Sequence, residues 1–239
     1  MSACLSVLFD SSSGAPSRGP GVFAAAPDSF SCGLLQDLER KAFFDNAILR
    51  GSALYQPCIE GLHGLTRTTP PKDYDVLVNF GRYDQFRREQ ARWGGNKPAS
   101  DPSFLIDYLR LFRVIKNPEV RFAVPPDRDG RYFVNIGGVY RGRPVDLMVE
   151  NLPHTLENTA QRSPDAPITG MAMDSGGRIA VHPLFNAHAR ALVYDPAAVG
   201  LDPAECQARF AKLSAKFPGL RLAEPEPPPT SAIWCRPHP

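Results

Sequence analysis

The chain has 239 residues, 43% of them hydrophobic, and a formal net charge of +2. This length is enough for one large domain with a sizeable core, and the composition is typical of a globular protein. So mild a positive charge neither requires nor excludes a nucleic-acid partner. No apolar run approaches the ~20 residues that a membrane-spanning helix needs, so we expect no membrane partner.

The cysteines and the first residues indicate a reducing compartment. Five cysteines are scattered without a Cys-x-x-Cys pair, and no metal-ligand spacing joins them to the five histidines. Thiols in a reducing environment are the simplest account of this pattern. The apolar run Leu5 to Phe9 lacks the basic start of a signal peptide. We therefore expect a cytoplasmic protein.

Composition divides the chain into three segments. Residues 1–31 are rich in Ser, Gly, Ala and Pro, which predicts a flexible N-terminal arm with at most one short strand, at residues 5–9. Residues 32–221 carry the patterns of helices and strands and are expected to form one domain. Residues 222–239 are rich in proline and are expected to form an extended C-terminal tail.

Apolar residues recur at helical spacing in several segments of the predicted domain. These segments span residues 32–49, 52–65, 104–116 and 203–217. Pro57 limits the second, because proline is comfortable only in a first helical turn, so this helix is expected to be short, bent or later in starting. The last is the clearest, since Asp202 is a natural N-cap and Pro203 stands at the first helical position.

Strand-like runs alternate with turn signals between these helices. They span residues 73–78, 120–124, 132–140, 145–149, 168–181 and 191–194. The runs between 120 and 149 read as an antiparallel meander, in which Gly137-Gly138 marks a bulge or a close approach. Residues 168–181 read as a hairpin, and we expect residues 191–194 to complete the sheet. The prediction is an α+β fold: a mixed β-sheet with helices packed mainly on one face.

Three aspartates form the candidate site. Asp73 and Asp75 alternate where an apolar strand begins, so their side chains point to the same face of the sheet while Tyr74 points to the other. Asp146 lies inside an apolar strand, where a buried charge is costly unless it is paired or bound to a metal. If the two strands are neighbours, the three carboxylates make an oxygen-rich cage suited to Mg²⁺ or Mn²⁺.

A Gly-Ser step upstream has the features of a phosphate site. Gly51 allows close approach of the backbone, and Ser52 opens a predicted helix whose free N–H groups and positive dipole end attract phosphate. Lys72 adds a cation beside the two neighbouring acids. Ion pairs offer a second interpretation: Lys72 could neutralise those acids, and Asp146 could pair with Arg141, Arg143 or another cation.

A basic, aromatic segment follows the first acidic strand. Its arginines are Arg82, Arg87, Arg88 and Arg92, interleaved with Tyr83, Phe86 and Trp93. Such a mixture suits contacts with nucleic-acid phosphates together with stacking on bases. The alternative is a solvated amphipathic helix whose aromatic residues face the core.

At these residues the chain resembles the nucleotidyltransferase superfamily, with its DNA polymerase beta-like fold, whose pattern is Gly-Ser, a spacer, Asp-x-Asp and a third acid on a later strand. The closer resemblance, over Ile48 to Asp195, is to the head domain shared by CCA-adding enzymes and bacterial poly(A) polymerases. Residues 73–78 are similar to that group's Lys-Asp-[Ile/Tyr]-Asp strand, and residues 167–179 to its later hairpin. The phosphate loop departs from the pattern, since Tyr55-Gln56 stands where the group has Arg-Asp.

The resemblance implies metal-dependent transfer of a nucleoside monophosphate from an NTP to an acceptor hydroxyl, on RNA such as a tRNA 3′ end or on another acceptor, including protein. Asp73 and Asp75 would hold Mg²⁺ or Mn²⁺ against the triphosphate, and Asp146 would orient or deprotonate the attacking hydroxyl and share a second metal. Two alternatives stay open. One is a toxin-type or defence-type nucleotidyltransferase, and the other is a nucleotide-binding or interaction module that has lost catalysis.

Overall fold

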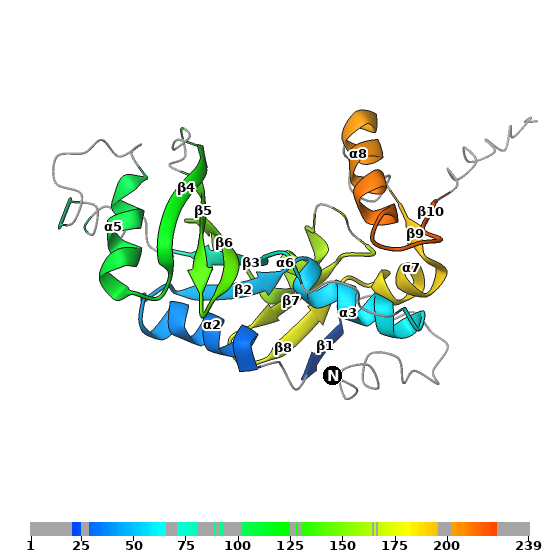
Figure 1. Cartoon of the computed structure of the whole chain (residues 1–239), viewed down its shortest axis with the longest axis horizontal. Helices are drawn as coiled ribbons and strands as arrows, with labels where there is room; N and C mark the ends of the chain where they lie inside the picture. The colour runs from blue at the N-terminus through cyan, green and yellow to red at the C-terminus, as the bar shows by residue number, and fades with distance from the viewer. Residues whose placement is uncertain are drawn as a thin grey trace, which may run out of the picture.

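The computed structural model describes residues 21–24, 29–65, 71–80, 88, 91–92, 102–124, 128, 131–163, 165, 167–195 and 202–223 (Figure 1). Its strands are β1 (Gly21–Ala24), β2 (Asn46–Arg50), β3 (Tyr74–Asn79), β4 (Lys116–Val124), β5 (Phe133–Tyr140), β6 (Arg143–Glu150), β7 (Met171–Asp174), β8 (Arg178–Val181), β9 (Val193–Tyr194) and β10 (Arg221–Leu222). Its helices are α2 (Ser29–Arg40), α3 (Ser52–Leu62), α5 (Ser103–Phe112), α6 (Leu156–Gln161), α7 (Phe185–Ala191) and α8 (Pro203–Ser214). None of these helices is long and apolar enough to cross a membrane.

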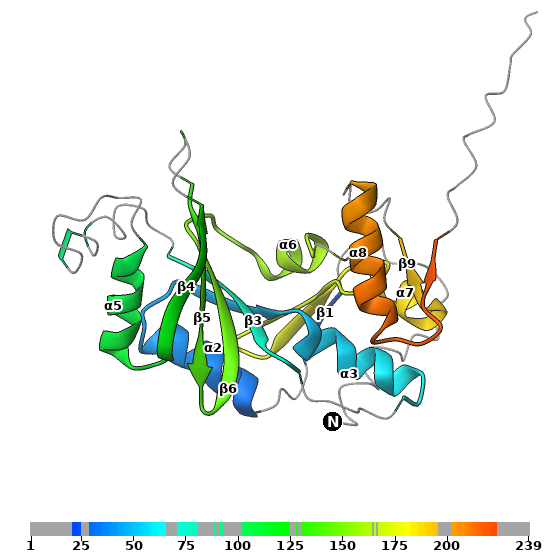
Figure 2. The same cartoon turned by 45° about the horizontal axis from the view of Figure 1, so that its top comes forward.

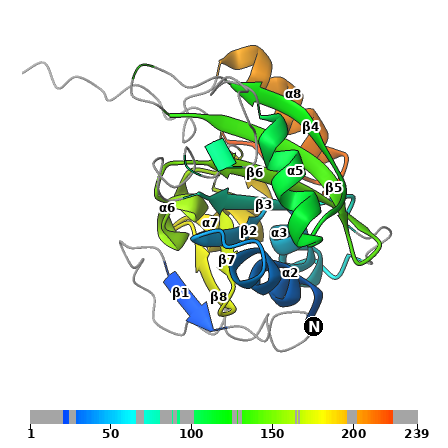
Figure 3. The ribbon, with the colours of Figure 1, turned by 90° about the vertical axis from the view of Figure 1, so that its left-hand side faces the viewer.

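One mixed sheet organises the fold, in the strand order β1-β8-β7-β2-β3-β6-β5-β4. β3 and β6 pair in parallel, and every other neighbouring pair of described strands in this sheet is antiparallel. Figure 3 shows the twist of the sheet between its two edge strands, β1 and β4. The predicted meander appears as β4, β5 and β6, and the predicted hairpin as β7 and β8. The α+β class with a mixed sheet is therefore confirmed.

Most of the hydrophobic core lies on one face of the sheet. There α2, α3 and α5 pack with the inward side chains of the central strands, such as Leu49, Val76 and Leu147. The opposite face carries only a small buried cluster under α6, which consists of Ile48, Leu156, Ala160, Ala172 and Ala180. In Figure 2, α2 lies on one side of the sheet and α6 on the other. The helices therefore pack mainly on one face, as the sequence predicts.

The predicted helix over residues 32–49 is wrong in its second half. The helix α2 ends at Arg40, and residues 46–50 form β2, a central strand paired with both β3 and β7. A strand that is buried on both faces has a continuous apolar run, and such a run cannot be told from a buried helix by periodicity alone. Burial from two sides, which is a tertiary effect, decides the outcome.

Other boundaries differ more modestly. Pro57 lies inside α3, which starts at Ser52 and is not displaced by it. The helix predicted over 104–116 ends at Phe112, because Arg113 adopts a left-handed conformation with φ of 53° and closes it. Residues 21–24 and 29–31 of the predicted arm belong to β1 and α2, whereas the predicted strand at residues 5–9 and the tail from residue 224 lie outside the described residues.

A small C-terminal unit, which consists of α7, β9, α8 and β10, stands at the far end of the sheet from α5 (Figure 1). Residues 193–194, expected to complete the main sheet, instead pair in parallel with β10 in a separate two-stranded sheet, so that prediction is wrong. The helix α3 links this unit to the main sheet: the ring of Tyr55 lies 6.2 Å from that of Phe217, and His63 Nε2 lies 2.8 Å from the carbonyl oxygen of Ala189. These contacts hold α8 over the end of the strands that carry the aspartates.

Candidate functional site

The parallel pairing of β3 and β6 brings the predicted aspartates together. Asp75 lies opposite Asp146 in the register, on strands that are about 4.8 Å apart, and paired residues point to the same face. Asp73 precedes Asp75 by two residues and lines the same cavity as Asp75. Tyr74 points to the other face, into the main core, where its hydroxyl accepts a hydrogen bond of 2.5 Å from Arg143 Nη1. The carboxylates thus lie on the face of the sheet that the core leaves less covered.

Gly51 joins β2 to α3 in a conformation that only glycine tolerates. Its φ of 82° and ψ of −162° lie in a region that residues with a Cβ avoid. A Cβ at this position would also collide with the Asp75 carboxylate. No side chain caps the helix that follows, and the first N–H groups of a helix have no partner within it. The predicted phosphate site therefore has an open helix start directly beside the predicted metal ligands.

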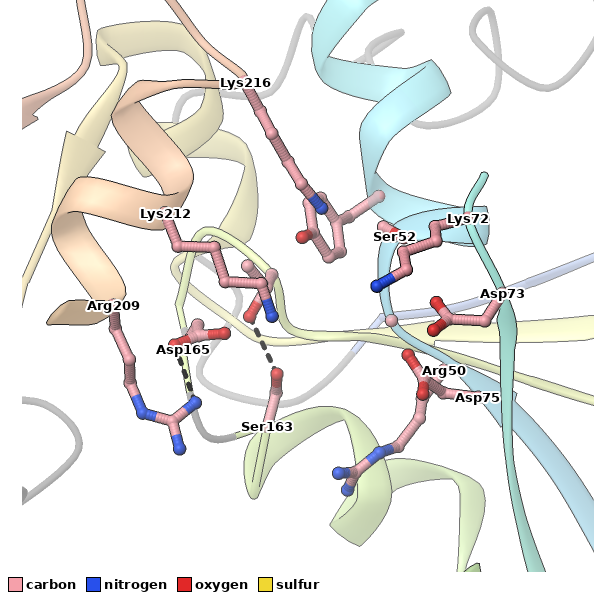
Figure 4. A pocket seen from close by; sticks show the side chains of 13 residues that line it. Arg50, Ser52, Lys72, Asp73, Asp75, Ser163, Asp165, Arg209, Lys212 and Lys216 are labelled. Atoms are coloured by element: carbon pink, nitrogen blue, oxygen red, sulfur yellow. Dashed lines mark hydrogen bonds and ion pairs between the residues drawn. The ribbon is translucent and has the colours of Figure 1, made fainter. Parts of the chain in front are cut away.

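A cavity of about 360 Å³ lies between the start of α3, the entry to β3, the loop after α6, and α8. Its lining residues are Arg50, Gly51, Ser52, Tyr55, Lys72, Asp73, Asp75, Ser163, Asp165, Thr169, Arg209, Lys212 and Lys216. Figure 4 shows Asp73 and Asp75 on one side and Lys212 and Lys216 extending toward them from the other. The volume is in the usual range for small-molecule sites. Five basic side chains surround the carboxylates of Asp73, Asp75 and Asp165, so the cavity suits an anion bound together with a cation.

The predicted residue Lys72 lines this cavity and is exposed. Of the predicted nucleic-acid contacts, Arg88 and Arg92 are exposed, whereas Arg82 and Arg87 lie outside the described residues. The structure places neither of the two described arginines in the lining of the cavity. Their role in binding nucleic acid stays a prediction.

The cations of the last helix are the main feature that our sequence analysis missed. Arg209 and Lys212 lie on α8, and Lys216 follows its last turn. Their spacing of three and then four residues places them on one helical face, and this spacing was the available signal. Nothing in the sequence shows that this face meets the aspartates more than 130 residues earlier in the chain. Arg209 is held by ion pairs with Asp165 (3.0 Å) and Glu205 (2.7 Å), which orient it at the cavity wall.

Burial and crowding of negative charge make Asp75 reluctant to ionise. The pKa of Asp75 is raised to about 6, mainly by burial and also by the neighbouring negative charges of Asp73 and Asp146, while the positive charge of Arg50 opposes the rise. Burial also lowers the pKa of Arg50, whose backbone pairs with that of Asp75, and the charge of Asp75 offsets part of this effect. A divalent cation bound beside Asp75 would offset the crowded negative charge and favour the ionised form of this carboxyl.

Asp146 differs from the other two aspartates, because Arg121 Nη1 donates a hydrogen bond to its Oδ1. The alternative foreseen for Asp146, an ion pair, is therefore realised, with a cation from β4 rather than with Arg141 or Arg143. In the described part of the chain, no group of three or more His, Cys, Asp or Glu side chains is arranged to hold a metal ion. Asp73 and Asp75 remain as two carboxylates, which is the number that Mg²⁺ commonly takes from a protein when substrate phosphates supply further ligands.

Replacement of Gly51 tests the close approach of α3 to Asp75. We expect Gly51→Ala to lower the free energy of unfolding by roughly 2–5 kcal/mol, because it combines backbone strain with a steric collision. The matched control is Gly64→Ala: Gly64 also has a positive φ, of 62°, but no atom would meet its added Cβ. The control should cost only about 1–2 kcal/mol. Urea unfolding measures both, and equal costs would contradict the close approach.

The pH dependence of stability tests the environment of Asp75. A carboxyl whose pKa is raised to about 6 binds its proton more tightly in the folded than in the unfolded chain, so the free energy of unfolding should fall as the pH rises from about 4 to about 6. Asp75→Asn removes this ionisation. The variant should lose that slope and, at pH 7, be more stable by up to about 3 kcal/mol, since each pKa unit corresponds to about 1.36 kcal/mol.

Denaturant unfolding at several pH values between 4 and 7 gives the comparison. The control is Asp107→Asn, which removes a half-exposed carboxylate on α5, at the other end of the sheet. This control should keep the wild-type slope. An unchanged slope in Asp75→Asn would show that Asp75 ionises normally.

Comparison with known proteins gives similarity only at the level of solved structures. No protein-family model and no curated protein matches the chain. Two solved structures are similar at 13% identity: a tRNA-processing enzyme in its apo form I, with a TM-score of 0.46 over 84% of this chain and 45% of that one, and a tRNA-processing enzyme in complex 3, with a TM-score of 0.44 over 80% and 43%. The chain thus spans less than half the length of either structure to which it is similar.

Proposed function

We propose that the protein is a metal-dependent nucleotidyltransferase, which transfers a nucleoside monophosphate from an NTP to an acceptor hydroxyl on RNA or on another molecule. The observation that carries this proposal is the cavity in which Asp73 and Asp75 face Lys212 and Lys216 beside the open start of α3. A triphosphate needs the cations and the helix start, whereas the carboxylates would repel it unless a cation lies between them.

The residues present fit a divalent cation at Asp73 and Asp75. Mg²⁺ or Mn²⁺ bound there would supply neutralisation of the triphosphate charge and polarisation of the phosphate that reacts. The raised pKa of Asp75 fits this role, because a buried carboxyl crowded by other acids gains most from a cation partner. On the side of the cavity that carries the two aspartates, the basic side chains that can offset their negative charge are those of Arg50 and Lys72.

The protein's own groups would position the nucleotide. Backbone N–H groups after Gly51 and the hydroxyl of Ser52 would donate hydrogen bonds to phosphate oxygens, and Lys212 and Lys216 would neutralise the leaving pyrophosphate from the opposite wall. Burial and the positive charge of Lys212 lower the pKa of Lys216, and the negative charges of the aspartates that line the cavity oppose this shift.

The reaction forms a bond between the acceptor oxygen and the α-phosphorus and breaks the bond to pyrophosphate. Asp146, on the strand next to Asp75, would orient the acceptor hydroxyl and receive its proton. In such a transfer, catalysis consists mostly of positioning and of charge neutralisation.

One observation favours a second candidate, a module that binds nucleotide without transferring it. Arg121 holds Asp146, and the third carboxylate is therefore engaged rather than open to a metal or an acceptor. The two candidates share the nucleotide cavity and differ in whether transfer follows binding. Metal-dependent transfer of label separates them.

Transfer from labelled nucleotides tests the reaction. The full chain is incubated with each α-labelled NTP, with Mg²⁺ or Mn²⁺, and with a cell extract that is then divided between RNase and protease. We expect label in a macromolecule, and we expect Asp73→Asn to reduce it by roughly 10²–10³-fold, the range for loss of one preorganised charge contact. The treatment that removes the label identifies the acceptor as RNA or protein.

The control for this experiment is Asp107→Asn, which should transfer as well as the wild type, since its carboxylate lies on α5. Label that persists in Asp73→Asn would contradict a role for the cavity. A wild-type protein that binds NTP but transfers none of the four nucleotides would support the second candidate instead.

Nucleotide affinity tests the cations of α8. Lys212→Met keeps the length and the apolar stem of the side chain but removes its charge. We expect it to weaken ATP binding roughly 10-fold, because a hydrogen bond to a charged group contributes about 1.5–3 kcal/mol. Lys41→Met is the matched control: this lysine directly follows α2 and pairs with Asp37 at 3.0 Å. Calorimetric titration gives both affinities, and equal weakening would exclude a specific contact from α8.

A further inference from the structure

The ion pair between Arg121 and Asp146 spans three strands of the sheet. Arg121 belongs to β4, Asp146 belongs to β6, and β5 lies between them. The side chain must therefore cross β5, and it does so over Gly137, the residue that pairs with Asp146 in the register. A Cβ at position 137 would come within 2.6 Å of the guanidinium carbon. Glycine at this position thus leaves the path that the arginine uses.

An irregularity in β4 aims Arg121 along this path. Val120 pairs with Ile136 and Phe122 with Asn135, so Arg121 is the additional residue of a β-bulge. A bulge bends its strand and redirects a side chain, and bulges are frequent beside active sites. The bulge in β4, the glycine on β5 and the acid on β6 converge on one contact. Such a set is unlike a surface ion pair formed by two flexible side chains.

The contact occupies the carboxylate that would complete a three-acid site. Asp75 and Asp146 are paired in the register, and Asp73 lies two residues from Asp75. With the guanidinium on its Oδ1, Asp146 is neutralised by a charge that belongs to the chain. The side chain of Arg121 remains 44% exposed, so it is accessible to solvent.

We propose that Arg121 is the built-in counterion of Asp146, and that it competes with a divalent cation for this carboxylate. With Arg121 in place, the site offers a cation only Asp73 and Asp75. With Arg121 displaced, Asp146 joins them and the affinity for divalent cations rises. This inference rests on the proposed function, since it assumes that the two other aspartates bind a cation.

Binding of Mn²⁺, followed by loss of the electron paramagnetic resonance signal of the free ion, tests the inference without any activity assay. We expect Arg121→Met to bind Mn²⁺ at least about 10-fold more tightly than the wild type, because the number of charged ligands sets divalent-cation affinity. Gly137→Ala should act in the same direction by pushing the guanidinium aside while leaving its charge in the chain. Adding Asp146→Asn to Arg121→Met should abolish the gain.

Arg110→Met is the matched control for loss of one positive charge, since this exposed arginine lies on α5. The control should leave the affinity unchanged. If the wild type binds Mn²⁺, Asp73→Asn removes this binding, and Arg121→Met brings no gain, the inference is wrong while the proposed metal site stands. If neither the wild type nor Arg121→Met binds Mn²⁺, both are overturned.

Discussion

The parallel pairing of β3 with β6 is the contact on which both the sheet and the candidate site depend. Parallel neighbours cannot be joined by a tight turn, so the chain between them forms α5, β4 and β5 and returns to pair with β3 from the far side. The register of this pair sets Asp75 against Asp146, and with Asp73 it concentrates negative charge at one edge. Folding therefore places acidic side chains where their ionisation is unfavourable, and for this reason the pKa of Asp75 is raised to about 6. Such a concentration is stable only beside cations, which Arg50, Arg121 and α8 supply.

The uneven coverage of the two sheet faces explains why the site is accessible. Helices α2, α3 and α5 bury one face, whereas α6 covers only a small apolar cluster on the other. Since successive residues of a strand alternate between faces, Tyr74 and Val76 enter the main core while Asp73 and Asp75 point to the open side. The helix α3 then has two roles: its start lies beside Asp75, and its packing on Phe217 and Ala189 holds the unit that carries Lys212 and Lys216.

The cations of α8 and Arg121 differ in how they approach the carboxylates of the site. The side chains of α8 approach across a cavity and leave room between themselves and the carboxylates, as Figure 4 shows for Lys212 and Lys216. Arg121 reaches its carboxylate along the sheet surface and leaves no room, because it contacts Asp146 directly. The first arrangement suits an anionic ligand bound with a metal ion. The second suits control over how many carboxylates that metal ion meets.

Local pattern in the sequence determined the α+β class, the meander, the hairpin, the capped last helix, and the shared face of Asp73 and Asp75, because alternation and capping are properties of neighbouring residues. It also indicated that Asp146 needs a partner, since an acid within an apolar strand must be compensated. Only the tertiary structure decided that residues 46–50 form a strand, that Arg121 is the partner of Asp146, and that the cations of α8 face the aspartates. Each of these outcomes depends on contacts between segments far apart in the chain. Periodicity within a segment carries no information about such contacts.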